Sequence, residues 1–287
     1  MTKKAATTPS TQVGRRIHSS KGKQPMRKSI LGLSAVAFAM LATPAFADEA
    51  ADPLGLKVTG NVAGVSDYRF RGFSQSSEDP AVQGGITVTH TSGLYVGTWA
   101  SSISFAGNTE VDLFAGYSKE VVPGITVDGG LLFYLYPQHN KTASTNYFEP
   151  YLNVIGTYGP ATLKVGVNYA WEQSALLGIR TNSDLGQKVS SIYFHAEPSV
   201  TIPNTPFGLN AHIGYAESDS FLGGFGEEGK VIDYSVGATA TWKNLTFGVS
   251  YVDTDEASVR TTGIGAGLGA EAIGADGAAV FSLTATF

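Results

Sequence analysis

Cysteine is absent from the 287-residue chain, and charged residues are scarce. Without cysteine there is no disulfide scaffold, no thiolate metal site and no cysteine nucleophile. Charged side chains make up 15% of the sequence, against about 25% in ordinary soluble proteins. Glycine, at 35 residues, and aromatic side chains, at 11%, are abundant instead. This composition argues against a typical cytosolic enzyme, whose surface carries more lysine and glutamate.

Acidic residues are missing from the first 47 positions, which hold eight lysines and arginines. The bases are followed by 13 apolar or small residues, Ile30–Ala42, and then by an Ala-x-Ala site that ends at Ala47. This order is typical of a secretory signal peptide, and the apolar stretch is shorter than the roughly 20 residues of a membrane-spanning helix. We expect residues 1–47 to be a signal peptide cleaved before Asp48, with residues 1–25 as an extension ahead of an ordinary start.

Long apolar runs are also missing from residues 48–287, so the sequence excludes a helical membrane span there. The recurring pattern is strict alternation of apolar and polar residues, which predicts strands. In residues 231–242, for example, Ile232, Tyr234 and Val236 alternate with Asp233 and Ser235. Most of these segments have the length of a tilted strand that crosses the hydrocarbon layer. Twelve such segments lie near 56–70, 82–90, 94–103, 109–118, 125–136, 147–156, 161–172, 189–201, 207–217, 231–242, 245–252 and 278–287.

The connections between these segments are alternately short and long, with one exception, as in outer-membrane barrels. The polar strand faces carry mainly Gly, Ser, Thr and Asn, whereas the outer face of a soluble sandwich would be polar and charged. We therefore predict an all-β fold, an antiparallel transmembrane β-barrel of about twelve strands, over residues 48–287. An aromatic girdle is expected near the strand ends, at Tyr68, Phe70, Tyr169, Trp171, Tyr215, Trp242 and Tyr251.

The last predicted strand places Phe281, Leu283 and the terminal Phe287 on one face. This ending resembles the sorting signal that the bacterial barrel-assembly machinery reads. We therefore expect that machinery and outer-membrane lipid to be partners of the protein.

A longer resemblance lies in the first two hairpins. Residues 61–76 read NVAGVSDYRFRGFSQS and are followed by DPAVQGG at 79–85 and SGLYVGTWAS at 92–101. This string is similar to the TorF family of porins, long filed as a conserved hypothetical family of Gram-negative bacteria. The resemblance implies an outer-membrane, porin-like barrel and implies neither a substrate nor catalytic residues.

Motifs for cofactors and catalysis are weak. The G-x-G-x-x-G string at 224–229 precedes a strand rather than the helix that nucleotide binding needs. Asp253, Asp255 and Glu256 resemble the start of a calcium loop that lacks its glycine and distal glutamate. The histidines have no zinc-ligand spacing. We predict that the protein has no cofactor, no metal and no nucleic-acid partner, and that it is not an enzyme. A barrel-embedded hydrolase stays as a minor alternative, because a catalytic triad can be assembled from residues far apart in the sequence.

The predicted function is passive diffusion of small solutes through an outer-membrane channel. On the polar strand faces eight acids stand against three bases, which predicts a preference for cations in a narrow lumen. Glu197 is expected at the constriction. A closed barrel acting as a structural, adhesion or loop-binding protein is the alternative. The candidate pore-lining residues are Asp67, Arg69, Asp112, Asp128, Glu149, Lys164, Asn168, His195, Glu197, Asn210, His212 and Asp233.

Overall fold

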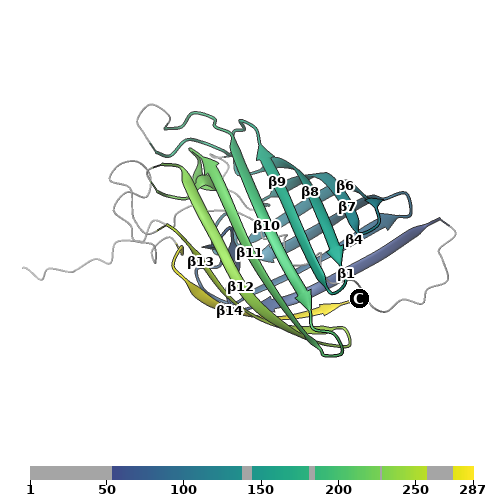
Figure 1. The fold of residues 1–287 in the computed structure, drawn as a ribbon. Helices are drawn as coiled ribbons and strands as arrows, with labels where there is room; N and C mark the ends of the chain where they lie inside the picture. The colour runs from purple at the N-terminus through teal and green to yellow at the C-terminus, as the bar shows by residue number, and fades with distance from the viewer. Residues whose placement is uncertain (1–53, 138–143, 181–184, 227, 257–273) are drawn as a thin grey trace, which may run out of the picture.

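The computed structural model describes residues 54–137, 144–180, 185–226, 228–256 and 274–287. These residues form a closed barrel of antiparallel strands and a separate two-stranded hairpin (Figure 1). Among them, no helix is long and apolar enough to cross a membrane.

The barrel strands follow one another along the chain. They are β1 (Leu56–Val65), β4 (Ala81–His90), β5 (Leu94–Ser102), β6 (Thr109–Val122), β7 (Ile125–Leu135), β8 (Tyr147–Tyr158), β9 (Ala161–Ala170), β10 (Ser191–Thr201), β11 (Phe207–Ser218), β12 (Lys230–Trp242), β13 (Leu245–Thr254) and β14 (Ala278–Thr286). The other elements are β2 (Arg69–Phe70), β3 (Phe73–Ser74) and the 3₁₀ helix η2 (Phe221–Gly223).

Each barrel strand pairs with the barrel strand that follows it, and β1 closes the barrel by pairing with β14. Val62 of β1 lies opposite Gly84 of β4 on one side and opposite Ala285 of β14 on the other. The twelve predicted barrel strands are therefore confirmed. Because their number is even, β1 begins and β14 ends at the same end of the barrel as the short turns, and the longer loops lie at the opposite end (Figure 1).

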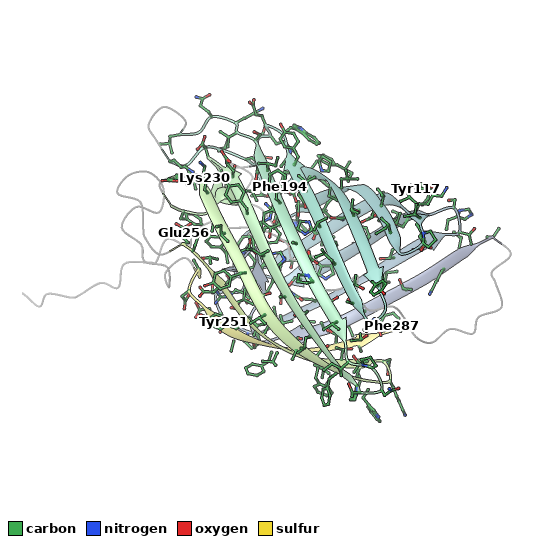
Figure 2. All side chains as sticks on the ribbon, in the orientation of Figure 1. Tyr117, Phe194, Lys230, Tyr251, Glu256 and Phe287 are labelled. Atoms are coloured by element: carbon green, nitrogen blue, oxygen red, sulfur yellow. The ribbon has the colours of Figure 1, made fainter. Side chains whose placement is uncertain are left out.

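The alternation of residue types determines which side of the barrel each side chain faces. In β12, Ile232 and Val236 are 38% and 62% exposed on the outer surface, whereas Asp233 is 2% exposed inside. Exposed aliphatic side chains recur on the outer face of strand after strand. Aromatic side chains lie near both rims: Tyr117 and Phe287 toward the short turns, and Tyr251 toward the long loops (Figure 2). The outer surface is the apolar belt that a membrane barrel presents to lipid.

The prediction of a strand over residues 56–70 is wrong beyond Val65, where β1 ends. The following residues turn into the barrel, and β2 and β3 form what we call the inner hairpin, residues 66–76. Tyr68 and Phe70, predicted to belong to the outer girdle, are buried inside at 1% and 6% exposure.

Local polar contacts explain why the ladder of β1 stops there. The carboxylate of Asp67 accepts hydrogen bonds from the hydroxyls of Ser74, at 2.7 Å, and Ser76, at 3.1 Å. The Ser76 hydroxyl also accepts a hydrogen bond from the backbone N–H of Tyr68. The segment is therefore closed on itself through its side chains, which removes it from strand pairing.

Candidate functional site

A cavity of about 700 Å³ occupies the lumen from the short turns to beyond its middle, because Tyr134, Tyr193 and Asp233, which line it, lie near the long-loop ends of their strands. It extends from Lys243 and Phe287 near the short turns to residues 67–72 of the inner hairpin. Much of its wall consists of amide and hydroxyl side chains, including Asn61, Asn210, Thr239, Ser250, Ser282 and Thr284. Such a wall can hydrogen-bond water and small polar solutes without holding them tightly.

Nearer the long loops, packed side chains narrow the lumen, and several of them, including Trp99, Phe114 and Tyr134, also border the cavity. The ring of Tyr68 packs edge-on against Trp99, with the centroids 5.5 Å apart, and its hydroxyl donates to Oε1 of Glu110 at 2.9 Å. The aromatic and aliphatic residues packed together in this half include Tyr68, Phe70, Trp99, Ile103, Phe105, Phe114, Tyr134, Tyr136, Tyr147 and Leu176. The inner hairpin thus lies at the boundary between a wet and a dry half of the barrel.

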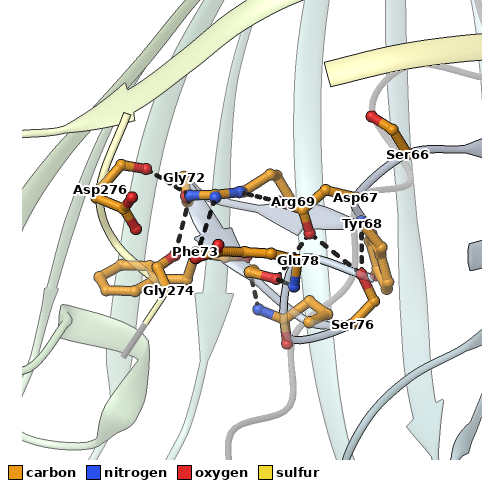
Figure 3. Close-up of polar contacts among 12 residues, drawn as sticks. Ser66, Asp67, Tyr68, Arg69, Gly72, Phe73, Ser76, Glu78, Gly274 and Asp276 are labelled. Atoms are coloured by element: carbon orange, nitrogen blue, oxygen red, sulfur yellow. Dashed lines mark hydrogen bonds and ion pairs between the residues drawn. The ribbon is translucent and has the colours of Figure 1, made fainter. Parts of the chain in front are cut away.

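Arg69 fastens the inner hairpin to the last long loop (Figure 3). Its Nε donates to Oδ2 of Asp67 at 2.5 Å. Its Nη1 donates to three carbonyl oxygens, at 3.2, 3.0 and 2.7 Å, those of Gly72, Gly274 and Asp276. The salt bridge to Asp67 therefore has a structural role.

Glu78 lies just beyond this network, with its Oε1 3.9 Å from Nη2 of Arg69 (Figure 3). The pKa of Glu78 is raised above its ordinary value, mainly by two effects. The larger is desolvation of its carboxyl, and the second is the nearby carboxylate of Asp276.

Arg71, at the tip of the inner hairpin, makes the second charged anchor. Its Nη2 donates to Oε1 of Glu149 at 2.8 Å, and its guanidinium carbon lies 3.9 Å from the ring centroid of Tyr193. The other carboxylate oxygen of Glu149 accepts hydrogen bonds from Tyr134, at 3.0 Å, and Asn168, at 3.1 Å. Four strands, β7 to β10, thus supply the groups that surround this ion pair.

Glu197 is the centre of a second polar network, which borders the cavity. Its Oε2 lies 2.8 Å from Nζ of Lys164, and its Oε1 lies 2.9 Å from Nδ1 of His195. On the adjacent strands, His212 Nε2 and Asp233 Oδ1 are 2.8 Å apart. The imidazoles of His195 and His212 are nearly parallel, with centroids 6.3 Å apart, so the two predicted histidines do meet inside the barrel.

Most of the predicted pore-lining residues face the cavity. Ten of the twelve line it, and the exceptions are Asp112 and Glu149, which are buried in the long-loop half at 0% and 1% exposure. Asp128, one of the ten, accepts hydrogen bonds from Tyr95 and Asn153. Whether these residues control permeation stays a prediction.

The sequence reasoning missed Arg71 and Tyr193. Arg71 was assigned to a loop, and nothing in its neighbours indicates that this loop folds inward. Tyr193 lies on the inner face of β10 and belongs to the same polar alternation as His195. Glu172, counted among the eight acids, is exposed beyond the end of β9.

The calcium-like acids have structural partners. Asp253 accepts hydrogen bonds from the hydroxyls of Tyr234 and Tyr251, both at 2.9 Å. Asp255 and Glu256 accept backbone N–H groups, at 2.7 and 2.9 Å. In the part of the chain that the structure describes, no three acidic or histidine side chains form a group that could hold a metal ion.

Two porins of known structure share this fold. The chain matches the NanC porin with a TM-score of 0.55 at 11% identity, over 79% of this chain and 98% of that one. It matches the KdgM porin with a TM-score of 0.51 at 8% identity, over 80% of this chain and 98% of that one. At such identities the likeness shows the fold alone, which is that of outer-membrane porins.

Sequence comparison is less informative about function. No curated protein sequence matches the chain. The TorF assignment stays a prediction, because the matching family model carries another description. That model, described as a bacterial protein of unknown function (Gcw_chp), covers residues 47–287, and the chain belongs to this family.

Proposed function

We propose that the protein is an outer-membrane channel through which small polar solutes diffuse passively. The observation that carries the proposal is a cavity of about 700 Å³, with many hydroxyl and amide side chains in its wall, inside a closed barrel with an apolar outer surface. A barrel with this surface is suited to lipid, and its hydroxyl- and amide-lined interior is suited to water and dissolved solutes. Outer-membrane lipid, the barrel-assembly machinery and small solutes are the partners that this role requires.

We further propose a modest preference for cations. The cavity lining carries four carboxylates, Asp67, Asp128, Glu197 and Asp233, and four bases, Arg69, Arg71, Lys164 and Lys243. Three more carboxylates, Glu110, Asp112 and Glu149, are buried in the long-loop half. The excess of acids is smaller than the eight against three counted in the sequence, because Arg71 and Lys243 join the bases, whereas the base Lys57 and the acid Glu172 are exposed and do not line the cavity. The preference should therefore be weaker than the strand pattern alone suggests.

Conductance in a planar bilayer tests both statements. The refolded protein should produce discrete current steps in potassium chloride, and its reversal potential across a salt gradient should favour potassium. An insertion-competent protein that carries no current, even after the inner hairpin is shortened as described in the Discussion, would contradict the channel. A reversal potential that favours chloride would contradict the cation preference alone.

A closed barrel that acts through its loops is the second candidate function. It is favoured by the filled long-loop half and by Arg180, which binds two long loops together. The Arg180 guanidinium donates to five carbonyl oxygens, those of Ser218, Ser220, Gly223, Gly224 and Gly226. A rigid loop surface of this kind suits an adhesion or structural protein.

We infer that the protein is not an enzyme. A close serine–histidine contact, between His90 Nδ1 and Ser92 Oγ at 2.8 Å, lies in an exposed short turn. The backbone N–H of Ser92 also donates to that nitrogen, so the contact stabilises the turn. An assay of lipid or peptide hydrolysis by the folded barrel checks this inference, and turnover would overturn it.

A further inference from the structure

The tip of the inner hairpin has an unusual residue at a demanding position. Phe70 pairs with Phe73, so Arg71 and Gly72 form a two-residue turn, with φ values of 46° and 84°. Positive φ at both central residues is the geometry of a type I′ turn, which favours Asn-Gly. Arginine in the left-handed region is strained, and such strain persists only where the surroundings hold the residue in place.

The surroundings of Arg71 form a receptor for a planar cation. Its guanidinium lies over the Tyr193 ring, with the Phe70 ring centroid 4.7 Å away, and its Nη2 bonds to Glu149. The side chain is 5% exposed, and Nε and Nη1 find no acceptor in the described residues. A guanidinium stacked on aromatic rings and paired with a carboxylate is the arrangement that proteins use to bind guanidinium ligands.

This receptor belongs to the wall of the barrel, whereas its occupant belongs to the hairpin. Glu149, Tyr134, Asn168 and Tyr193 lie on β7 to β10, and their contacts do not depend on the hairpin backbone. Tyr134, Asn168 and Tyr193 also line the polar cavity, and Arg71 covers Glu149 on that side. Movement of Arg71 out of the receptor would therefore expose Glu149 to solutes in the cavity.

A buried carboxylate that loses its partner must be compensated by another cation, by water or by a proton. Of the other bases that line the cavity, Lys164 pairs with Glu197, Arg69 pairs with Asp67, and Lys243 lies far from Glu149 in the short turn between β12 and β13. A solute that carries a guanidinium group would supply the same donors and the same planar face as Arg71. By occupying the position of the Arg71 side chain, such a solute would also keep the hairpin tip away from the barrel wall.

We propose that Arg71 is an internal ligand in a cation site formed by Glu149 and Tyr193, and that solutes bearing a guanidinium group compete with it for this site. The inference rests on the proposed channel function, because it treats solutes with a guanidinium group as solutes that pass through the barrel. The site itself can be tested without any measurement of current.

The first test uses the protein refolded in detergent micelles with Trp171→Phe and Trp242→Phe. The sequence has three tryptophans, so Trp99, which contacts Tyr68 of the inner hairpin, becomes the only one. L-Arginine should change the Trp99 emission with saturation, and L-citrulline, its uncharged counterpart, should not. Equal responses to the two amino acids would overturn the proposal.

Variants then separate the ligand from its receptor. Arg71→Asn places the preferred residue in the turn, so the barrel should fold, and it should bind arginine about tenfold more tightly or better because the internal competitor is gone. Glu149→Gln should abolish saturation, whereas Glu120→Gln, which changes an exposed carboxylate beside a short turn, should leave it unchanged. An unaltered arginine affinity in either Arg71→Asn or Glu149→Gln contradicts the proposal.

A separate measurement distinguishes this inference from the channel function. If Arg71→Asn conducts potassium chloride but gains no affinity for arginine, the channel is supported and the site is rejected. If it binds arginine tightly, and neither it nor the variant with the shortened hairpin carries current, the site is supported and the channel is rejected. Heat-dependent gel mobility, which reports barrel folding, confirms that each variant compared is folded.

Discussion

The two halves of the barrel interior are built from the same strands and filled in different ways. Toward the short turns, hydroxyl and amide side chains surround a cavity of about 700 Å³. Toward the long loops, the rings of Tyr68, Phe70 and Tyr134 are less than a tenth exposed, and the charges there are held in fixed pairs such as Arg71 with Glu149. The pair of Lys164 and Glu197 therefore borders the space open to solutes, whereas Arg69 with Asp67 and Arg71 with Glu149 hold the inner hairpin in position.

This difference shows that the barrel wall and the obstruction inside it are determined separately. The wall follows from strand alternation and closes through the pairing of β1 with β14, in which residues 66–76 take no part. The inner hairpin follows from a few specific contacts with that wall, of which Glu110, Glu149 and Tyr193 supply three. Changes to the hairpin should therefore alter permeability strongly while the barrel persists.

Shortening the inner hairpin should produce the largest effect. Tyr68 and Gln75 are already linked by a hydrogen bond from N–H of Gln75 to the carbonyl of Tyr68. Replacing Arg69–Ser74 by Asn-Gly keeps this pair as the end of a shorter hairpin. Glu149→Gln is added so that no carboxylate is left buried without Arg71, whereas Asp67, which loses Arg69, borders the cavity and keeps its hydrogen bond from Ser76. Because the tip no longer crosses the lumen, single-channel conductance should rise by about tenfold.

The control for this variant is Glu149→Gln alone, which keeps the full hairpin. It should conduct at most a few times better than the wild type. A shortened hairpin with wild-type conductance would show that the obstruction lies elsewhere in the lumen.

Removing one carboxylate from each half should lower the free energy of unfolding by different amounts. Glu149→Gln leaves Arg71 buried without its partner and should lower the free energy of unfolding by about 3 kcal/mol. Glu197→Gln leaves Lys164 beside the cavity, where water can solvate it, and should cost about 1 kcal/mol. Urea unfolding in lipid vesicles, followed by tryptophan fluorescence, measures both. Equal losses of unfolding free energy in the two variants would mean that water is excluded from both sites to the same extent.

Much of the wall could be predicted from the sequence, because alternation with period 2 directly records which side chains face lipid. The inner hairpin could not be predicted, since the same alternation continues through Tyr68 and Phe70 although both lie inside. What ends β1 is a set of side-chain contacts around Asp67 with residues seven and nine positions later. Such contacts leave no periodic pattern. The position of Arg71 depends on the same turn, so the receptor at Glu149 was missed with it.

Deleting Phe287 should affect assembly more than stability. The side chain is 71% exposed at the short-turn end, although the backbone of Phe287 exchanges hydrogen bonds with Gly60 of β1. We expect the free energy of unfolding to change by less than about 1 kcal/mol, because little apolar area is buried. The amount of folded protein in the outer membrane should nevertheless fall, as quantified by heat-dependent gel mobility. Normal amounts would remove the argument that the C-terminal strand is a sorting signal.

The smallest expected effect concerns ion selectivity in the wet half. Glu197 borders the cavity and holds Lys164 and His195 on its two carboxylate oxygens. Glu197→Gln removes one negative charge and frees one positive charge at the same level of the lumen. The ratio of potassium to chloride permeability should therefore fall by about a factor of two, because water in the cavity screens these charges only in part.

Lys164→Gln is the matched control, since it removes the other member of the pair. It should raise the permeability ratio by a similar factor, and the double variant should return to the wild-type ratio because the net charge at this level is restored. Reversal potentials across a salt gradient, measured for the four proteins under identical conditions, complete this cycle. If Glu197→Gln and Lys164→Gln both leave the ratio unchanged, the narrowest part of the path lies at another level, and the inner hairpin, with Arg71 and Glu149, becomes the place where ions are selected.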